Sequence, residues 1–390
     1  MHNYDVIIAG GAIMGSSCAW FLSKERGFSG RVLVIEKDPA YQKCSTTLSI
    51  SSIRQQFSTP INIRISKFGF EFLRSISADT SSEFDIGLVE QGYLLLSDAS
   101  GVRRLQKNVE LQHAEGADVG LLEPRDIAAR FPWLSVEDVP LASLGLSGEG
   151  WFDAHSLLQY FKGGACEGDV TYIKGEVTGL NVEADRVNSV TLADGRVYGC
   201  GHFINASGTG AANVAEMAGI RVPIEARKRC VFVIDCRDAD KVMNCPHLID
   251  STGVWVKPKG QYFITGTTPP ANLDIACSDF EVDHYLFDDY VWPLLARRIP
   301  AFEAVKVVGA WAGHYAYNLL DQNAIIGPHP EIGNFIFANG FSGHGVQQAP
   351  AVGRAISELI SYGEYRSLDM SDLGFSRIPE GRKLLEKNVF

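Results

Sequence analysis

The hydrophobic pattern at the start of the chain predicts a strand, a glycine turn, a helix and a second strand. An apolar run over 4–9 is followed at once by the turn 10–15, and then by an apolar stretch of small residues over 16–22. A second apolar run over 31–35 ends at Glu36. Short apolar runs bounded by glycine are typical of buried strands, so this pattern predicts one β-α-β unit.

Strand-like and helix-like segments alternate along the rest of the chain, which is typical of an α/β protein. Apolar residues at helical spacing predict helices over 61–76, 102–115, 123–131, 156–167, 282–298 and 346–361, and another begins near Ala211. Strands are expected over 92–96, over 202–208 where the strand runs into a glycine turn, within 229–267, and over 324–326 and 335–338. The segment 170–200 is predicted to be a β-meander of strands over 170–173, 175–181, 186–192 and 197–200.

The first unit has the residue types that bind the ADP half of a dinucleotide. Gly10 permits a tight turn, and Gly15 lets the helix pack close to the strand. The start of the helix presents N–H groups and the positive end of its dipole to a pyrophosphate. Glu36 would accept hydrogen bonds from the ribose hydroxyls. Ala12 replaces the glycine at which the backbone usually comes nearest to the phosphates, and the alternative is an ordinary buried strand–turn–helix.

Composition and charge exclude several classes of protein. Hydrophobic residues make up 46% and charged residues 21% of the 390, as in globular proteins generally. The formal net charge of −11 argues against nucleic acid or an anionic membrane as the main partner. No apolar stretch reaches the roughly 20 residues of a membrane span, and no signal peptide is expected before the first strand. The eight cysteines form no zinc-type cluster, so we expect no metal, reduced thiols and a cytoplasmic location.

Four further segments, 44–57, 175–178, 204–208 and 340–345, carry a resemblance to a known family. Together with the N-terminal unit they resemble the FAD-dependent amine and amino-acid oxidoreductases of the D-amino-acid oxidase family. That family includes sarcosine oxidase, glycine oxidase and dimethylglycine dehydrogenase. Segments 313–318, 321–323 and 327–330 are most similar to its mitochondrial FAD-dependent oxidoreductase domain-containing subgroup, which is linked to complex I assembly.

The resemblance implies a two-lobed α/β flavoprotein, with a Rossmann-like FAD-binding domain and a mixed-sheet substrate domain. The expected division is 1–85, 150–225 and 305–390 for the FAD-binding domain, which is discontinuous, and 86–149 and 226–304 for the substrate domain. The FAD is expected to be non-covalent, because the segment where sarcosine oxidases carry a cysteine has His314 instead, and because 45–47 contains no histidine.

The cofactor contacts implied by the resemblance lie in the N-terminal unit, the segment 45–53, the adenine-side strand and the two later glycine turns. They are Gly10, Ala12, Ile13, Met14, Gly15, Glu36, Lys37, Ser45, Thr46, Thr47, Ser52, Ile53, Val177, Ala206, Ser207, Gly208, Gly313, Gly340, Ser342, Gly343, His344, Gly345, Val346 and Gln347.

The last of these segments is expected to seat the flavin ring. Gly340, Gly343 and Gly345 permit the backbone to approach a flat ring. A helix is predicted from Val346, and Pro350 falls in its first turn, where proline is tolerated. The helix dipole would support the negative charge that gathers at the N1/C2 edge of the ring on reduction. A purely structural glycine loop is the alternative.

The reaction implied is hydride transfer from the carbon beside an amine nitrogen to flavin N5, followed by hydrolysis of the imine. Arg54 is the first candidate to grip a substrate carboxylate through two parallel hydrogen bonds; a phosphate contact or a surface ion pair is the alternative. His344 would contact the flavin or the substrate, or only cap its loop. Tyr315 and Tyr317 would share one strand face and form a wall around an N-alkyl group, or belong to the core; Tyr262 is a weaker candidate of the same kind.

Departures from the family pattern concern the carboxylate ligand and the electron acceptor. Gln347 stands where sarcosine oxidases carry a carboxylate-binding lysine, and the strand 261–266 lacks the lysine that promotes attack by oxygen. An electron-acceptor protein or a companion subunit is therefore a possible partner, beside a small amino-acid-like substrate. Three other functions stay open: a flavin-dependent 2-hydroxy-acid dehydrogenase, a flavin-stabilised assembly protein without turnover, and a protein with NAD as its main cofactor.

Overall fold

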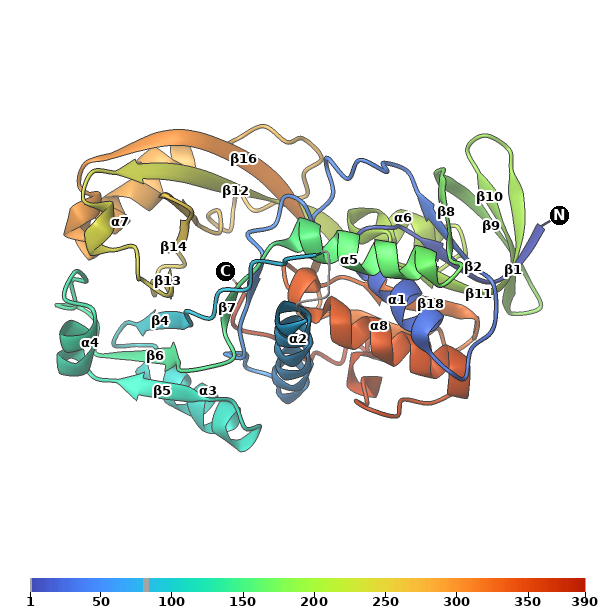
Figure 1. The fold of residues 1–390 in the computed structure, drawn as a ribbon, viewed down its shortest axis with the longest axis horizontal. Helices are drawn as coiled ribbons and strands as arrows, with labels where there is room; N and C mark the ends of the chain where they lie inside the picture. The colour runs from blue at the N-terminus through green and yellow to red at the C-terminus, as the bar shows by residue number, and fades with distance from the viewer. Residues whose placement is uncertain (1, 80–83, 390) are drawn as a thin grey trace.

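The computed structural model describes residues 2–79 and 84–389 and has two lobes. Figure 1 shows the lobe that contains the N-terminus on the right, and a second lobe on the left to which the long strands β12 and β16 extend. Each lobe is built on its own sheet, and the short pair β3 (Ser52–Ile53) and β7 (Gly150–Trp151) forms a third.

The first sheet has the order β17-β18-β11-β1-β2-β8, with β10 and β9 attached to β11. Its strands are β1 (His2–Ala9), β2 (Val32–Glu36), β8 (Thr171–Lys174), β9 (Val177–Glu183), β10 (Arg186–Leu192), β11 (Val197–Asn205), β17 (Ile325–Pro328) and β18 (Phe335–Asn339). The pairs from β18 to β8 are all parallel. The helices of this lobe are α1 (Ile13–Lys24), α2 (Pro60–Ala78), α5 (Ala154–Glu167), α6 (Ala211–Glu216) and α8 (Gly345–Tyr362).

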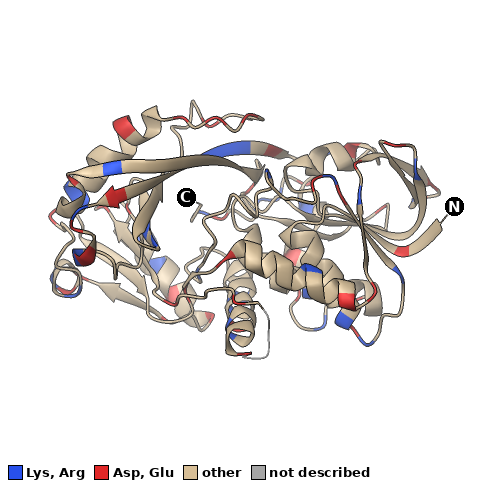
Figure 2. Ribbon diagram, turned by 45° about the horizontal axis from the view of Figure 1, so that its top comes forward, with Lys and Arg blue, Asp and Glu red and all other residues tan. Residues whose placement is uncertain are grey.

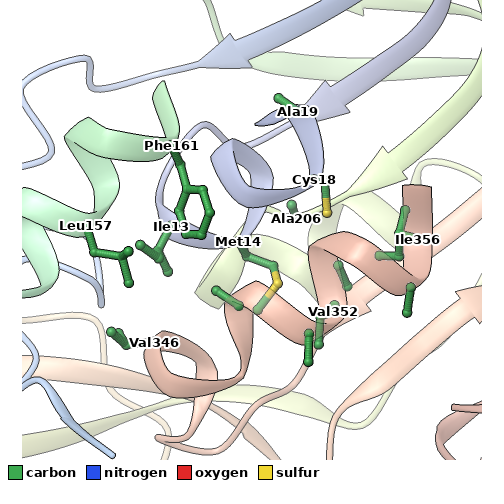
Figure 3. Packing of buried hydrophobic residues seen from close by; sticks show 14 of the residues in the cluster. Ile13, Met14, Cys18, Ala19, Leu157, Phe161, Ala206, Val346, Val352 and Ile356 are labelled. Carbon is green, nitrogen blue, oxygen red and sulfur yellow. The ribbon is translucent and has the colours of Figure 1, made fainter. Parts of the chain in front are cut away.

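The core of the first lobe lies under three helices, with α1 between α5 and α8. Figure 3 shows Cys18 of α1, Phe161 of α5 and Ile356 of α8 among its side chains, all of them fully buried. The contact of α1 with α8 is close, because a Cβ on Gly353 would lie 2.2 Å from the Ser17 hydroxyl. That hydroxyl donates to the Ala349 carbonyl. The start of α8 is therefore held firmly against α1.

The second sheet has the order β16-β12-β15-β14-β13-β4-β6-β5. Its strands are β4 (Tyr93–Ser97), β5 (Val119–Leu122), β6 (Leu141–Gly145), β12 (Ile224–Cys236), β13 (His247–Ile249), β14 (Trp255–Lys259), β15 (Tyr262–Gly266) and β16 (Val305–Asn318), and its helices are α3 (Val102–Ala114), α4 (Pro124–Arg130) and α7 (Trp292–Arg298). The pair β13–β4 is parallel and the others are antiparallel, so the sheet is mixed, as predicted.

The two faces of the second sheet pack differently. One apolar cluster includes Phe232 and Phe287, and it joins the sheet to α7 and to the segment before it. The other cluster consists of Tyr93, Leu95, Val231, Ile249, Trp255 and Ile264, and Ile50 packs against it. Because Ile50 belongs to the segment that leads into β3, this second face is turned toward the first lobe.

Several predicted elements differ from the observed ones. The meander is wrong at its first strand, because β8 pairs in parallel with β2 and not with β9; α5 provides the crossover. The strands predicted over 197–200 and 202–208 form the single strand β11, which ends at Asn205. In this strand Gly201 lies so close to Asp5 that a side chain would not fit.

The helix predicted over 282–298 begins later and contains a π-helical turn over 287–291 before α7. The physical reason is Pro293, which has no N–H to donate to the preceding turn. The sheet pairing also departs from the predicted division at 305–318, because β16 is an edge strand of the second sheet. Residues 1, 80–83 and 390, which that division includes, lie outside the described residues.

Candidate functional site

The predicted site residues gather where the parallel strands of the first sheet end. Strands β1, β2, β11 and β18 end at Ala9, Glu36, Asn205 and Asn339, all at the same edge. The three predicted glycine turns follow β1, β11 and β18. Ligands of open α/β sheets bind at this carboxyl edge. The parallel pairing therefore brings together segments that are more than 300 residues apart in the chain.

The first glycine turn has no room for a side chain at Gly10 or at Gly15. Gly10 has a φ of 98°, and a Cβ there would lie 2.4 Å from the Ala206 carbonyl oxygen. A Cβ on Gly15 would lie 1.9 Å from the Gly10 oxygen. The tight turn and the close helix packing predicted for these two glycines are confirmed. Ala206 in turn donates its N–H to Ala9, which joins the second glycine turn, at Ser207 and Gly208, to the first.

Glu36 and Tyr41 form a polar cradle beside this turn. The Glu36 carboxylate accepts the N–H groups of Gly11 and Asp38, each at 2.8 Å. The hydroxyl of Tyr41 is buried and has no hydrogen-bond partner among the described residues. It lies 3.5 Å from the position that a Cβ on Gly11 would occupy. An orphaned hydroxyl next to a strand-end carboxylate fits the adenosine half of a dinucleotide. Lys37 is exposed.

The start of α1 fits a bound anion. No side chain caps the helix and its first turn has no acidic residue. The N–H of Ile13 donates to the Thr46 hydroxyl at 3.3 Å. The side chains of Ile13, Met14 and Val346 belong to the apolar core (Figure 3), so these three residues can offer only backbone groups to a ligand. The backbone N–H groups at the start of α1 are therefore suited to bind an anion.

Several of the predicted cofactor ligands use their side chains within the protein. The Ser45 hydroxyl donates to the His314 carbonyl, and that of Thr47 donates to the Tyr41 carbonyl. The Ser342 hydroxyl accepts the N–H of Asn318. The amide oxygen of Gln347 accepts the N–H of Arg54 at 2.9 Å. These four side chains therefore hold the segments 45–47 and 340–347 in place through hydrogen bonds within the protein.

The remaining predicted cofactor residues lie along the same edge. Ser52 and Ile53 form β3, and Val177 begins β9 just after Gly175, whose N–H donates to Glu36. Gly313 packs on Leu48, where a Cβ would come within 2.9 Å. The segment 45–53 thus runs between β16 and the glycine turns of the first lobe.

The last glycine loop, 340–345, lies against β16. A Cβ on Gly343 would lie 2.5 Å from the ring of Tyr315, and Gly343 has a φ of 95°. Gly340 also has a positive φ, of 70°. His344 is the N-cap residue of α8, whose first turn has no acidic residue. The loop therefore leads into the start of α8 as expected, and its role as a flavin seat stays a prediction.

Arg54 is the centre of the candidate substrate end. Its side chain is only 6% exposed, so the surface ion pair considered for it is wrong. Its Nη2 lies 3.2 Å from the Nε2 of His344 and donates to the carbonyl of Asn388. Its guanidinium carbon lies 4.4 Å from the Phe57 ring and 5.9 Å from the Tyr93 ring. Burial and the charge of Arg54 hold the pKa of His344 well below its usual range, so this imidazole is neutral.

The predicted tyrosines do not share one environment. Tyr315 lies close enough to Arg54 for that charge to act on its hydroxyl, and Arg229 lies 5.1 Å from its ring. Tyr317 instead contacts Arg227, at 5.7 Å. Figure 2 shows the basic stretch of β12 from which both arginines come. Tyr262, at the half-buried start of β15, pairs with Lys259.

Three further buried polar residues belong to the site, and the sequence analysis missed the first two of them, Glu149 and His247. Glu149 is fully buried and accepts the N–H groups of Gln55, Gln56 and Tyr93. His247 is 1% exposed and, among the described residues, is the only histidine with both ring nitrogens buried and unpartnered. No spacing in the sequence connects these residues with Arg54.

Lys257 is the third of them. Its Nζ donates to the Ile50 carbonyl at 2.6 Å and lies 5.1 Å from the Trp151 ring. Burial lowers its pKa well below the usual range. The strand 261–266 thus lacks the lysine that promotes attack by oxygen in the family, but the neighbouring strand β14 carries Lys257 on the face turned toward the first lobe.

Glu149 should make stability depend on pH. Burial raises its pKa from 4.5 to about 7. The folded state therefore binds more protons than the unfolded state between these values, and stability falls as pH rises through that window, by up to about 1.4 kcal/mol per pH unit. Glu149→Gln should flatten this slope. Unfolding free energies at pH 5, 6 and 7 check it, and an equal slope in both proteins would contradict it.

The described residues contain no helix long and apolar enough to cross a membrane. The same part of the chain holds no group of three or more His, Cys, Asp or Glu that would bind a metal ion.

Comparison with known proteins agrees with this geometry. Residues 5–359 match the family model described as FAD dependent oxidoreductase. The chain is 39% identical over 422 residues to FAD-dependent oxidoreductase domain-containing protein 1 of Xenopus laevis, covering 99% of this chain and 84% of that protein. It is 25% identical to sarcosine oxidase subunit beta of Rhizobium meliloti (strain 1021), covering 93% and 85%. The crystal structure of L-proline dehydrogenase from P. horikoshii superimposes with a TM-score of 0.86, at 27% identity, over 98% and 99% of the two chains.

A parallel sheet with glycine turns at its carboxyl edge, facing a mixed sheet, defines the class of two-lobed flavoproteins. Glycine oxidase from Geobacillus kaustophilus shares this fold, with a TM-score of 0.81 at 20% identity over 97% and 99% of the chains. The protein belongs to the FAD-dependent oxidoreductase family, which confirms the resemblance seen in the sequence.

Proposed function

We propose that this protein binds FAD without a covalent bond and oxidises a secondary, N-methylated or other small amino acid at the carbon next to nitrogen. The observation that carries the proposal is the buried guanidinium of Arg54, which lies beside His344 at the end of the glycine loop. Sarcosine and proline, which the names of two relatives give as substrates, are both secondary amino acids.

The residues that would hold FAD lie in the glycine turns at the carboxyl edge of the first sheet. The backbone of 10–15 and Glu36 would bind the ADP half, and 340–345 with the start of α8 would receive the ring. FAD supplies the acceptor for the hydride that leaves the substrate carbon. A non-covalent link is supported by His314, whose ring packs 4.3 Å from that of Phe280.

The carboxylate end of the substrate would be held by Arg54. A guanidinium forms two parallel hydrogen bonds with a carboxylate, and both are strong in a buried site. The imidazole of His344 contacts the guanidinium and, because it is neutral, leaves Arg54 as the cation that attracts the substrate carboxylate. This arrangement selects substrates with a carboxylate.

The amine end would face the second sheet. The apolar face formed by Leu95, Ile249 and Trp255 disfavours an ammonium ion, so it favours the neutral amine whose lone pair assists departure of the hydride. His247 lies on this sheet with its ring centre 4.3 Å from that of Tyr93. Burial lowers the pKa of His247 well below its usual range, so the imidazole is neutral and accepts an N–H from a secondary amine. Loss of hydride from the substrate carbon would leave an iminium ion, which would give its N–H proton to water, and water would then hydrolyse the imine.

Anaerobic mixing with a panel of substrates tests the proposal. Sarcosine, proline and glycine should bleach the flavin, and N,N-dimethylglycine, which as a free amine has no N–H, should do so more slowly. His247→Leu should remove that difference. Bleaching by 2-hydroxy acids alone would favour the hydroxy-acid dehydrogenase. An oxidised flavin with every compound would contradict amine oxidation.

The electron acceptor can be identified in the same experiment. We propose an acceptor other than oxygen, such as an electron-acceptor protein or a companion subunit. The hydrogen bond from the Nζ of Lys257 to the Ile50 carbonyl supports this proposal, because it engages the amino group within the protein. The reduced protein should be reoxidised faster by an artificial acceptor than by air-saturated buffer, and the reverse order would make it an oxidase.

A further inference from the structure

The segment Leu384–Asn388, here called the strap, enters the candidate site from the end of the chain. In Figure 1 the chain ends between the two lobes. Glu386 is 1% exposed, although a carboxylate is rarely buried. Its oxygens accept the Ser58 N–H at 2.9 Å, the Ser58 hydroxyl at 2.7 Å, the Thr59 hydroxyl at 2.9 Å and the Asn62 amide at 3.0 Å. The strap is therefore anchored at the start of α2.

The beginning of the strap is held separately. The N–H of Leu384 donates to the carboxylate of Asp321, and its carbonyl accepts from the Asn323 amide. Asp321 is itself fully buried and paired with the fully buried Arg377. These contacts fix the direction in which the strap runs toward Arg54.

The far end of the strap meets the substrate-binding guanidinium. The main-chain carbonyl of Asn388 accepts a hydrogen bond from Arg54 Nη2. The side-chain amide of Asn388 donates to the Gln56 carbonyl at 2.9 Å. A neutral carbonyl of the chain thus occupies a donor that a carboxylate would need.

Other arginines of this protein show how a guanidinium binds a carboxylate through two parallel hydrogen bonds, an arrangement called a fork here, and that Nη2 always takes part. Arg64 and Arg377 grip carboxylates through Nε and Nη2, and Arg229 does so through Nη1 and Nη2. Every one of these forks uses a proton on Nη2.

In Arg54 the Nη2 atom already has two partners, the Nε2 of His344 at 3.2 Å and the carbonyl of Asn388. One of these two groups must leave before a carboxylate can bind to Nη2. The His344 ring is buried and packs edge-on against the Phe57 ring, with 4.9 Å between the ring centres, so the Asn388 carbonyl is the group that can leave.

We propose that the strap closes the carboxylate end of the substrate site, and that a bound carboxylate displaces the Asn388 carbonyl from Arg54. This inference rests on the proposed role of Arg54 as the carboxylate ligand. If only molecules with an open strap bind a carboxylate, the apparent affinity for the carboxylate equals the intrinsic affinity multiplied by the fraction of open molecules. Substrate entry and strap opening are then one event.

Binding of acetate to the FAD-loaded protein, followed by the change in the visible flavin spectrum, tests this. Glu386→Ala removes the anchor and should lower the dissociation constant for acetate about tenfold, as expected when a mostly closed state becomes open. A chain that ends at Arg382 should behave in the same way. Lys387→Ala, an exposed position of the same segment, is the matched control and should bind acetate as the wild-type protein does.

Hydrogen exchange of the peptide that contains the strap gives a second readout. Acetate should raise its exchange in the wild-type protein, and acetamide, which carries no charge, should not. Equal dissociation constants in all four proteins, or exchange that acetate leaves unchanged, would overturn the proposal. Neither measurement needs turnover. A negative result in both would therefore not contradict amine oxidation, and a positive result can be obtained even if the protein oxidises no amine.

Discussion

Gly15→Ala should yield a protein that is purified without FAD. The new methyl group would lie 1.9 Å from the Gly10 carbonyl oxygen, which belongs to the backbone and cannot rotate away. The start of α1 must then move away from β1, and overpacking of this kind costs about 1–3 kcal/mol. The displaced N–H groups would bind the diphosphate roughly 100-fold more weakly, since each tenfold change in affinity corresponds to about 1.4 kcal/mol. The visible spectrum of the purified protein and its FAD dissociation constant measure the effect.

Gly333→Ala is the control for this experiment. Its Cβ would meet no atom within 4 Å, and Gly333 lies in a turn of the same lobe. It should retain FAD and the wild-type melting temperature. A yellow Gly15→Ala protein with wild-type affinity would show that the first glycine turn does not hold the cofactor.

Arg54→Lys should lower kcat/KM for the amino-acid substrate by about 100-fold, although it keeps the positive charge. Lysine presents a single ammonium group in place of the planar fork, and a charge-assisted hydrogen bond in a buried site contributes about 1.5–3 kcal/mol. The loss should appear in the rate of flavin bleaching at low substrate concentration. The visible spectrum of the oxidised flavin should not change, because the glycine turns still hold it.

Arg64→Lys provides the matched control, since it alters an exposed arginine that also forms a fork, with Glu115. It should leave kcat/KM unchanged. If Arg54→Lys kept full activity, the carboxylate ligand would have to be sought elsewhere, and the strap would lose its proposed function as well.

The sequence predicted the parts of the site that depend on local backbone geometry. The roles of Gly10 and Gly15 are set by a turn and a helix start within six residues, so one β-α-β unit was enough to identify them. In the loop 340–345 the positive φ of Gly340 and of Gly343 is likewise a local property, whereas the contact of this loop with a flavin stays a prediction. Side-chain roles were harder to predict, because Met14 turns into the core and Gln347 bonds to the backbone of Arg54.

The amino-acid sequence by itself determined the N-terminal β-α-β unit and the α/β class, because turns, strand ends and helix starts are encoded by neighbouring residues. The two lobes and the flavin were implied by the resemblance of its motifs to a known family. Only the tertiary structure decided what surrounds Arg54. Glu149, His247 and Asn388 come from three distant segments. No spacing along the chain records that Asn388 bonds to Arg54, or that Glu149 and His247 lie near enough for the charge of Arg54 to act on them. Their chemistry arises from burial and from contacts between lobes, which exist only in the folded chain.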